Sequence, residues 1–254
     1  MNLSEYDKMY QLEDSYWWFQ GRKRMIQSIL ERFLPEEPRP GRVLDVGCGT
    51  GMILQSYQKW SPVGADFSPL ALQYCQSRGL KRTVRADVTR LPFADNSLDL
   101  ILALDLIEHV ERHDLLIKEF QRVLRPGGCV MATVPAHPSL WSEHDVALHH
   151  YRRYTRKSFA KLLRHGNLKP IKYTYGLFFL HPAVVSFRLL QNLKNKLIPK
   201  TNGEPKAHLI SVPKWLNSLL IQIFSFEARL LRHMNFPTGT SLVVLAQKPK
   251  TKSS

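Results

Sequence analysis

The chain has 254 residues, enough for one full domain with an appendage, and its 44% hydrophobic and 22% charged residues are typical of a globular protein. Its three cysteines lie far apart in sequence, which argues against a disulfide framework or a cysteine zinc site and favours a reducing, cytoplasmic setting. The apolar stretch 173–187, which has no charged residue, is shorter than the roughly 20 residues that cross a bilayer, and the first residues lack a signal-peptide pattern.

The predicted elements alternate between strands and helices from residue 41 onward. The expected strands are 42–46, 62–66, 83–87, 98–104 and 130–134. The expected helices between them are 51–60, 69–79 and 113–124. This rhythm predicts a doubly wound, mostly parallel α/β sheet.

The rhythm changes after Pro135. A stretch rich in histidine and arginine leads into an expected helix over 157–165, and two further strands are expected at 169–179 and 241–247. The segment between those strands is partly apolar, with a helix over 215–231. Pro213 is expected just inside the start of that helix.

The positive charge is concentrated in the second part of the chain. Residues 1–150 carry 17 Lys and Arg against 19 Asp and Glu, for −2, whereas residues 151–254 carry 19 against 2, for +17. The second part therefore indicates an anionic partner: a phospholipid surface, a phosphorylated or carboxylated substrate, or nucleic acid. The plainer alternative is a solubilising surface with a basic tail.

A glycine-rich turn links the first expected strand to the first helix. Gly47, Gly49 and Gly51 follow Asp45 in the sequence VLDVGCGTG. Such a turn lets the backbone approach a ligand closely, and its spacing is tighter than that of dinucleotide-binding turns. It suits a compact amino-acid group, whose ammonium Asp45 could bind directly or through water. The alternative is that Asp45 only stabilises the turn.

Two more acidic residues end the next two expected strands. A carboxylate at Asp66 can accept both hydroxyls of a ribose. Asp87 offers an acceptor for an exocyclic amine, and Val88 offers an apolar contact for a purine. Because the carboxyl ends of parallel strands meet at one sheet edge, these acids and Asp45 predict a site for an adenosine joined to an amino acid.

Residues 40–136 resemble the class I S-adenosylmethionine-dependent methyltransferases of type 11, through VLDVGCGTG, GADFS, RADVTRLPFADNSLDLILALDLIEHV and LRPGG. The resemblance implies S-adenosyl-L-methionine as cofactor and a seven-stranded Rossmann-like sheet with an antiparallel last strand and a helical insert near the C-terminus. It also implies that residues 104–109 line the methionine and the reaction centre. The expected cofactor-binding residues are Asp45, Gly47, Gly49, Gly51, Asp66, Phe67, Asp87, Val88, Leu104 and Asp105.

We divide the chain into a core, a cap, an insert and a tail. The core comprises 41–181 and 239–249. Residues 1–40, with the sequence YWWFQGR, form a helical cap over the cofactor or, alternatively, an amphipathic helix packed on the sheet edge. Residues 182–238 form a basic, partly apolar helical insert: a lid, a membrane contact, or a pair of core-packing helices. Residues 250–254 form a disordered tail.

The acceptor side is expected in the loop after the fifth strand. Methyl transfer mainly requires alignment of the two reactants, and a general base is needed only if the acceptor must lose a proton. The candidates for base or positioning are His109, His144 and His149. The candidate substrate-binding residues are His137, His150, Arg152 and Arg153, the arginines binding an anionic group or merely covering the sheet edge with charge.

The same loop carries a cluster of metal-ligating residue types, namely Glu143, His144, Asp145, His149 and His150. Adjacent residues rarely point at one centre, and no ligand spacing is recognisable. We therefore expect no metal.

The sequence predicts a methyltransferase that acts on a small-molecule or lipid-like acceptor. An anionic acceptor is one option. It is expected in the cytoplasm, with peripheral association at the inner face of a membrane as an option. One alternative is an RNA or other nucleic-acid methyltransferase, which the absence of an Asn-Pro-Pro-Tyr motif after the fourth strand disfavours. The other is a non-catalytic nucleoside-binding protein, which the intact set of acids disfavours.

Overall fold

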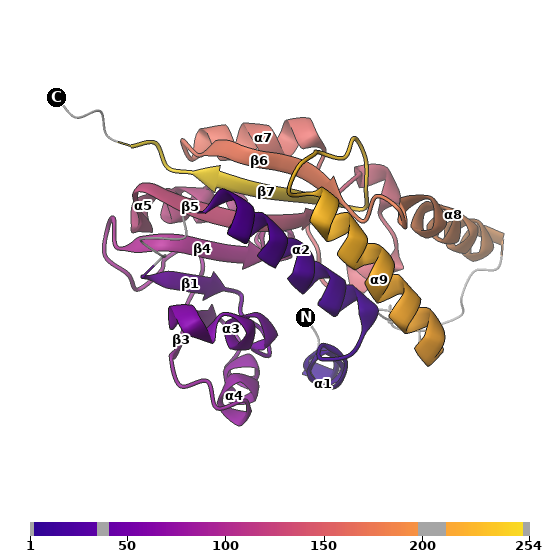
Figure 1. Ribbon diagram of the computed structural model, residues 1–254, viewed down its shortest axis with the longest axis horizontal. Coiled ribbons are helices and arrows are strands. Elements are labelled where there is room, and N and C mark those ends of the chain that lie inside the picture. The colour runs from indigo at the N-terminus through magenta and orange to yellow at the C-terminus, as the bar shows by residue number, and fades with distance from the viewer. Residues whose placement is uncertain (1–2, 35–40, 198–211, 251–254) are drawn as a thin grey trace.

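The computed structural model describes residues 3–34, 41–197 and 212–250. Its centre is a seven-stranded sheet with the order β3-β2-β1-β4-β5-β7-β6 (Figure 1). The strands are β1 (Val43–Val46), β2 (Val63–Asp66), β3 (Thr83–Arg85), β4 (Leu98–Leu104), β5 (Leu124–Pro135), β6 (Lys169–Gly176) and β7 (Ser241–Gln247). The first five strands are parallel, and β7 runs antiparallel to both β5 and β6. The expected fold is confirmed.

The helices come before the sheet, between its strands and before the last strand. They are α1 (Leu3–Leu12), α2 (Trp17–Phe33), α3 (Met52–Ser56), α4 (Pro69–Ser77), α5 (His113–Val123), α6 (Glu143–Ala147), α7 (Arg156–His165), α8 (His181–Leu197) and α9 (Lys214–Leu230). Short 3-10 turns are η1 (Gln58–Trp60), η2 (Ile107–His109) and η3 (Pro138–Leu140). No helix in the described residues is both long and apolar enough to cross a membrane.

The core is centred on β4, whose residues are buried except for the half-buried Asp99. Such a continuous apolar strand fits a sheet that is covered on both faces. Local signals set the helix ends: Ser68 caps α4, with Pro69 in its first turn, and Thr155 and Ser158 form a capping box at the start of α7.

Helices α2 and α9 lie side by side across the sheet, although they come from opposite ends of the chain (Figure 1). The ring of Phe224 lies against Gly21, where a Cβ atom would come within 1.8 Å of it. Ser28 Oγ donates to the Ala228 carbonyl at 2.6 Å, and the Trp17 N–H donates to Asn217 Oδ1 at 2.9 Å. The two helices therefore form one layer.

Some boundaries differ from the sequence prediction. The helix expected over 51–60 ends at Ser56 and continues as η1. Strand β6 ends at Gly176, because Leu177 has a left-handed φ of 57° that breaks the extended chain. Pro213 is the N-cap of α9 rather than its first residue. The division into core, cap, insert and tail stays a prediction; residues 35–40, 198–211 and 251–254 lie outside the described residues.

Candidate active site

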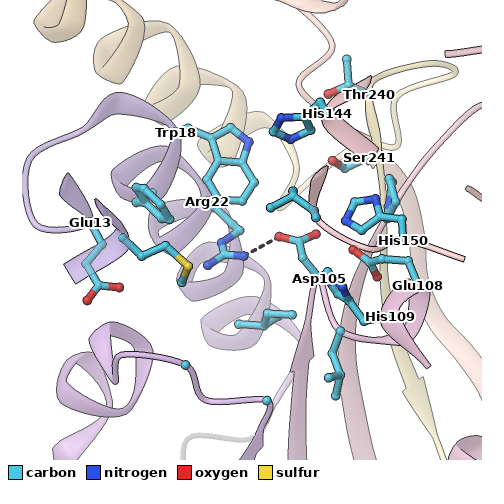
Figure 2. A pocket seen from close by; sticks show the side chains of 18 of the residues that line it. Glu13, Trp18, Arg22, Asp105, Glu108, His109, His144, His150, Thr240 and Ser241 are labelled. Atoms are coloured by element: carbon cyan, nitrogen blue, oxygen red, sulfur yellow. Dashed lines mark hydrogen bonds and ion pairs between the residues drawn. The ribbon is translucent and has the colours of Figure 1, made fainter. Parts of the chain in front are cut away.

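A cavity of about 1060 Å³ lies at the carboxyl ends of β1, β2 and β4 (Figure 2). Its walls come from these strand ends, from α1 and α2, from the loop after β5, and from α8 and α9. The cavity therefore adjoins the strand-end edge of the sheet where the sequence placed the site.

The glycine turn forms one end of this cavity. Gly47 and Gly49 have φ values of 70° and 53°, which are left-handed conformations that favour glycine. A Cβ atom at Gly47 would lie 2.7 Å from Leu106 Cδ1. The Gly47 N–H donates to the Ala65 carbonyl at 2.7 Å, which joins the turn to β2. The turn thus leaves a concave backbone surface that a side chain would obstruct.

Asp45 lines the cavity behind this turn. It is 3% exposed, and its Oδ2 has no hydrogen-bond partner among the described residues. Burial raises the pKa of Asp45 to about 8. A buried acid of this kind suits a cationic ligand group, because a neighbouring positive charge stabilises its ionised form.

Asp66 and Asp87 line the same cavity but differ in environment. Asp66 is 8% exposed and accepts from the backbone N–H groups of Gly49 and Ser68 at 3.0 and 2.9 Å. Burial raises the pKa of Asp66. Asp87 is exposed, and the backbone N–H of Thr89 lowers its pKa. Phe67, Val88 and Leu104 also line the cavity.

Two polar links fasten the N-terminal helices to this end of the sheet. Arg22 of α2 forms an ion pair with Asp105, which follows β4 (Figure 2). Glu13, 2% exposed, accepts from Thr50 Oγ1 and from Arg78 Nη2, both at 2.6 Å. No sequence pattern indicated these roles for Arg22 and Glu13, although Arg22 ends the aromatic motif YWWFQGR.

The loop after β5 is organised around Asp145, which is fully buried. Its Oδ1 accepts from Arg153 Nε at 2.8 Å and pairs with His150 Nδ1 at 2.9 Å. Arg188 of α8 lies 3.5 Å from its Oδ2. Burial alone would raise the pKa of Asp145, but the hydrogen bond from His150 and the charge of Arg153 outweigh it and lower that pKa.

Several expected acceptor-side residues take structural roles instead. Arg153 borders the cavity, but its guanidinium is engaged by Asp145 and by the Ala136 carbonyl at 3.0 Å. Arg152 donates to the carbonyls of Val110 and Glu111, at 3.0 and 2.9 Å. That these arginines bind an anionic substrate group stays a prediction, and both guanidinium groups are engaged by groups of the protein in this structure.

Three more expected residues do not line the cavity. Gly51 caps α3, where a Cβ atom would meet Leu80 and Cys75 rather than the cavity. The ring of His137 stacks on that of Tyr175, with centroids 5.3 Å apart. His149 has a left-handed φ of 57° in the turn after α6. Arg152 does not line the cavity either, and a role of these four residues in binding or catalysis stays a prediction.

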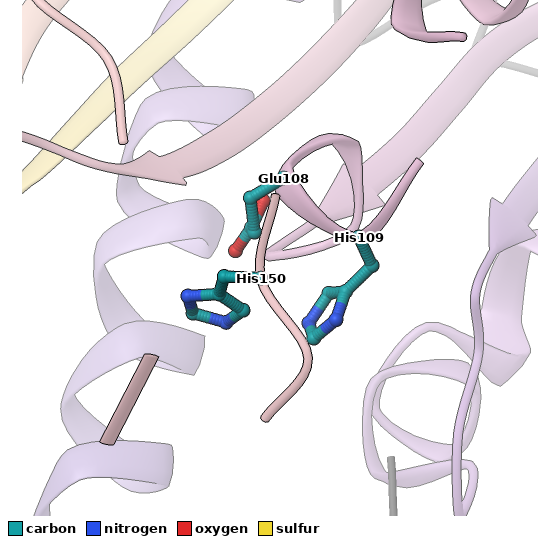
Figure 3. Close-up of side chains that lie close together, drawn as sticks. All are labelled: Glu108, His109 and His150. Atoms are coloured by element: carbon teal, nitrogen blue, oxygen red, sulfur yellow. The ribbon is translucent and has the colours of Figure 1, made fainter. Parts of the chain in front are cut away.

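Glu108, His109 and His150 converge at the cavity wall (Figure 3). One ligand atom of each lies within 4.8 Å of the others, and the two imidazoles meet edge to face with centroids 4.6 Å apart. Burial, and next the charge of His150, lower the pKa of His109 to about 3. His144 lies nearby, and burial lowers its pKa to about 4. Both His109 and His144 are therefore neutral near pH 7.

Comparison with known proteins fits this geometry. Residues 44–132, from β1 into β5, match the family described as a methyltransferase domain. A putative methyltransferase from Haloferax volcanii, solved in complex with the Trm112 methyltransferase activator, superposes with a TM-score of 0.62. The superposition covers 99% of this chain and 97% of that one at 18% identity, and so shows the fold. This chain contains a class I S-adenosylmethionine-dependent methyltransferase domain.

Relatives of this methyltransferase domain carry names that indicate different functions. The human protein named probable tRNA methyltransferase 9B is 34% identical over 108 residues, which are 41% of this chain and 24% of that protein. A phosphoethanolamine N-methyltransferase from Haemonchus contortus, solved with S-adenosyl-L-methionine, has a TM-score of 0.57 at 20% identity, over 89% of this chain and 52% of that one. The chain spans less than two thirds of the curated relatives it matches.

S-adenosyl-L-methionine is the cofactor of this methyltransferase domain, and the residues present fit it. Asp45, whose Oδ2 has no hydrogen-bond partner among the described residues, lines the cavity beside a glycine turn that a Cβ atom would obstruct. Asp66 stands at the end of the next strand, held by two backbone N–H groups.

Proposed function

We propose that the protein transfers a methyl group to a small-molecule or lipid-like acceptor with a substantial apolar part. The observation that carries this proposal is the apolar character of the cavity wall away from the glycine turn. That wall includes Leu177, Leu180, Ala183, Val184, Phe187, Val212 and Leu220. A surface of this kind favours an alkyl, prenyl or aromatic group over a phosphate backbone.

The size of the cavity supports two ligands. Small-molecule sites usually have about 300–1,000 Å³, and this cavity, at about 1060 Å³, lies just above that range. S-adenosyl-L-methionine supplies the activated methyl group. We assign its methionine part to Asp45 and the glycine turn, its ribose to Asp66, and its adenine to Asp87 and Val88.

The N-terminal helices are proposed to exclude water from the cofactor. Trp17 and Trp18 line the cavity, and the Arg22–Asp105 and Glu13–Arg78 pairs hold α2 and the α1–α2 turn against the strand ends. Exclusion of water matters because the sulfonium must meet the acceptor and not a solvent molecule.

The end of the molecule that carries α8 and α9 is proposed to contact an anionic membrane surface on the cytoplasmic side. Phe187 is 44% exposed, Leu219 45% and Trp215 69%. Residues 151–254 have a net charge of +17. Apolar side chains in a basic segment are the combination that binds anionic bilayers.

Liposome co-sedimentation tests this membrane proposal. The protein should sediment with vesicles containing phosphatidylserine but not with pure phosphatidylcholine vesicles, and 0.5 M salt should weaken binding. The double variant Trp215→Ala/Leu219→Ala should bind less, whereas Ile171→Ala, 41% exposed on β6, should not. Equal binding to both vesicle types would refute the proposal.

A nucleic-acid acceptor is the second candidate, because the human relative is named as a tRNA methyltransferase and the second part of this chain is strongly basic. Transfer of a tritiated methyl group distinguishes the two candidates. With membrane lipid extract and total tRNA offered together, the label should enter the organic phase. Label in tRNA would overturn the lipid proposal, and the assay should be repeated with a Trm112-type activator present.

Binding of S-adenosylhomocysteine, the demethylated cofactor, tests the proposed cofactor site separately from the acceptor. S-adenosylhomocysteine should bind to the wild-type protein in calorimetry and fail to bind to the Asp66→Ala variant. Failure of the wild-type protein to bind it would refute the methyltransferase activity itself.

A further inference from the structure

We propose that Glu108, His109 and His150 bind a divalent transition-metal ion at the wall of the cavity. These residues come from η2 and from the loop after α6, 41 and 42 positions apart in the sequence, and the fold brings them together (Figure 3). From the sequence, no metal is expected at the cluster of metal-ligating residue types within 143–150. Of that cluster, only His150 belongs to the proposed site.

The geometry fits a metal centre after small side-chain adjustments. The three ligand atoms lie within 4.8 Å of one another. Around a tetrahedral ion with bonds of about 2.0–2.2 Å, ligand atoms lie about 3.5 Å apart. Each side chain therefore has to move by about 1 Å or less, which rotation about its own bonds can supply.

Glu108 supplies an independent indication of a cation. It is 1% exposed, it lines the cavity, and its Oε2 has no hydrogen-bond partner among the described residues. The nearby arginines already have partners: Arg22 pairs with Asp105, and Arg153 pairs with Asp145. A buried carboxylate without a partner is costly, and a bound cation removes that cost.

Each histidine also has a hydrogen-bond partner outside the cluster, as metal-binding histidines usually do. His150 Nδ1 pairs with Asp145 Oδ1 at 2.9 Å, and Arg153 holds Asp145 in place. When His150 Nδ1 carries the proton, Nε2 keeps its lone pair for a metal. His109 is hydrogen-bonded to the backbone of Leu148.

The ligand types indicate which ions would bind. Two imidazole nitrogens and one carboxylate oxygen suit Zn²⁺, Fe²⁺ or Mn²⁺ better than Ca²⁺, which prefers oxygen ligands alone. Only three protein ligands leave at least one coordination position, as in catalytic zinc sites. Since all three residues border the cavity, that position is accessible to water or, if the proposed function holds, to an oxygen of the acceptor.

Metal binding can be measured without activity. The whole chain, stripped with a chelator and dialysed, is titrated with Co²⁺ while its visible absorption is recorded, and Zn²⁺ affinity is then measured by competition with a chromophoric chelator. The expected result is one ion per chain and a visible band typical of four- or five-coordinate cobalt.

Three variants assign the ligands. Glu108→Gln and His150→Asn should each weaken Zn²⁺ binding by at least tenfold, the second keeping a donor for Asp145 while removing Nε2. His144→Ala, which alters the cluster seen in the sequence, should keep wild-type affinity. S-adenosylhomocysteine calorimetry on each variant shows that it is folded, so a failure here is distinct from a failure of the proposed function.

Two results would overturn the proposal. One is the absence of stoichiometric binding by the wild-type protein. The other is a wild-type affinity for Zn²⁺ in both Glu108→Gln and His150→Asn, because the metal would then bind elsewhere. Loss of the ion in His144→Ala, or in a variant of the exposed His165 (His165→Ala), would be the clearest sign of such a different site.

Discussion

The buried carboxyl of Asp45 should couple cofactor binding to the release of a proton. Burial raises the pKa of Asp45 to about 8, and its Oδ2 has no hydrogen-bond partner among the described residues. The ammonium group of S-adenosylhomocysteine, placed beside this carboxyl, favours the ionised form and lowers the pKa. Below pH 8 the free protein holds a proton that the complex does not.

The size of the effect follows from that pKa. At pH 6.5, which is about 1.5 units below the pKa, roughly 97% of free Asp45 is protonated. If the complex restores a pKa of about 4, binding releases about one proton per ligand, and the affinity rises about tenfold per pH unit between roughly pH 5 and 7. The amino group of the ligand stays protonated over this range.

The same group also affects the stability of the ligand-free protein. The folded chain binds a proton that the unfolded chain loses near pH 4, so the unfolded state binds fewer protons over this window. The stability of the wild type relative to Asp45→Asn should therefore fall as the pH rises from about 4 to about 8.

Calorimetry measures the proton directly. S-adenosylhomocysteine is titrated at pH 6.5 in two buffers of different ionisation enthalpy, and the difference in observed heat gives the number of protons released. The wild type should release about one and Asp45→Asn, which keeps the size of the side chain, should release none. Equal proton counts in the two proteins would refute the assignment of Asp45 to the ligand's ammonium group.

Three further predictions concern single side chains. Asp66→Asn should weaken S-adenosylhomocysteine binding by about 10–100-fold in calorimetry, since an amide retains only one acceptor for the two ribose hydroxyls; unchanged affinity would place the ribose elsewhere. Phe224→Ala should lower the free energy of unfolding in urea by about 3–5 kcal/mol, because the ring of Phe224 is 1% exposed. Phe226 lies on the same helix but is 53% exposed, so Phe226→Ala should change this free energy by less than about 0.5 kcal/mol. Similar losses in the two variants would contradict the packing of α9 on α2. Asp145→Asn should cost about 3–5 kcal/mol because it leaves Arg153 buried without its charge partner, and a urea midpoint equal to that of the wild type would show that the pair carries no net stability.

The sheet could be predicted from the sequence because its signals are local. Residues 98–104 form an apolar run that only Asp99 interrupts, as is typical of a strand covered on both faces. The acids Asp45, Asp66 and Asp87 could be placed at one edge because parallel strands end there, and all three line the cavity. Apolar runs and strand direction were sufficient for these features.

The other half of the site depends on contacts that no local pattern specifies. The apolar residues of α9 are compatible with a membrane, a lid or a core, and the contact of Phe224 with Gly21 on α2 emerges only from the three-dimensional packing. His150 meets Glu108 because Asp145 holds the intervening loop in place. Charge alone could not indicate that Arg152 donates to a backbone carbonyl or that Arg153 pairs with the buried Asp145.

The pairing of α2 with α9 also has a consequence for synthesis on the ribosome. Ser28 and Ala228, which join the two helices, are 200 residues apart. At about 5–20 residues per second, α2 waits roughly 10–40 s for its partner to be translated. Until then the apolar side of α2 is uncovered, and the nascent chain needs protection from aggregation during that interval. The cofactor cavity, which α2 and α9 both border, is completed only after α9 has been translated.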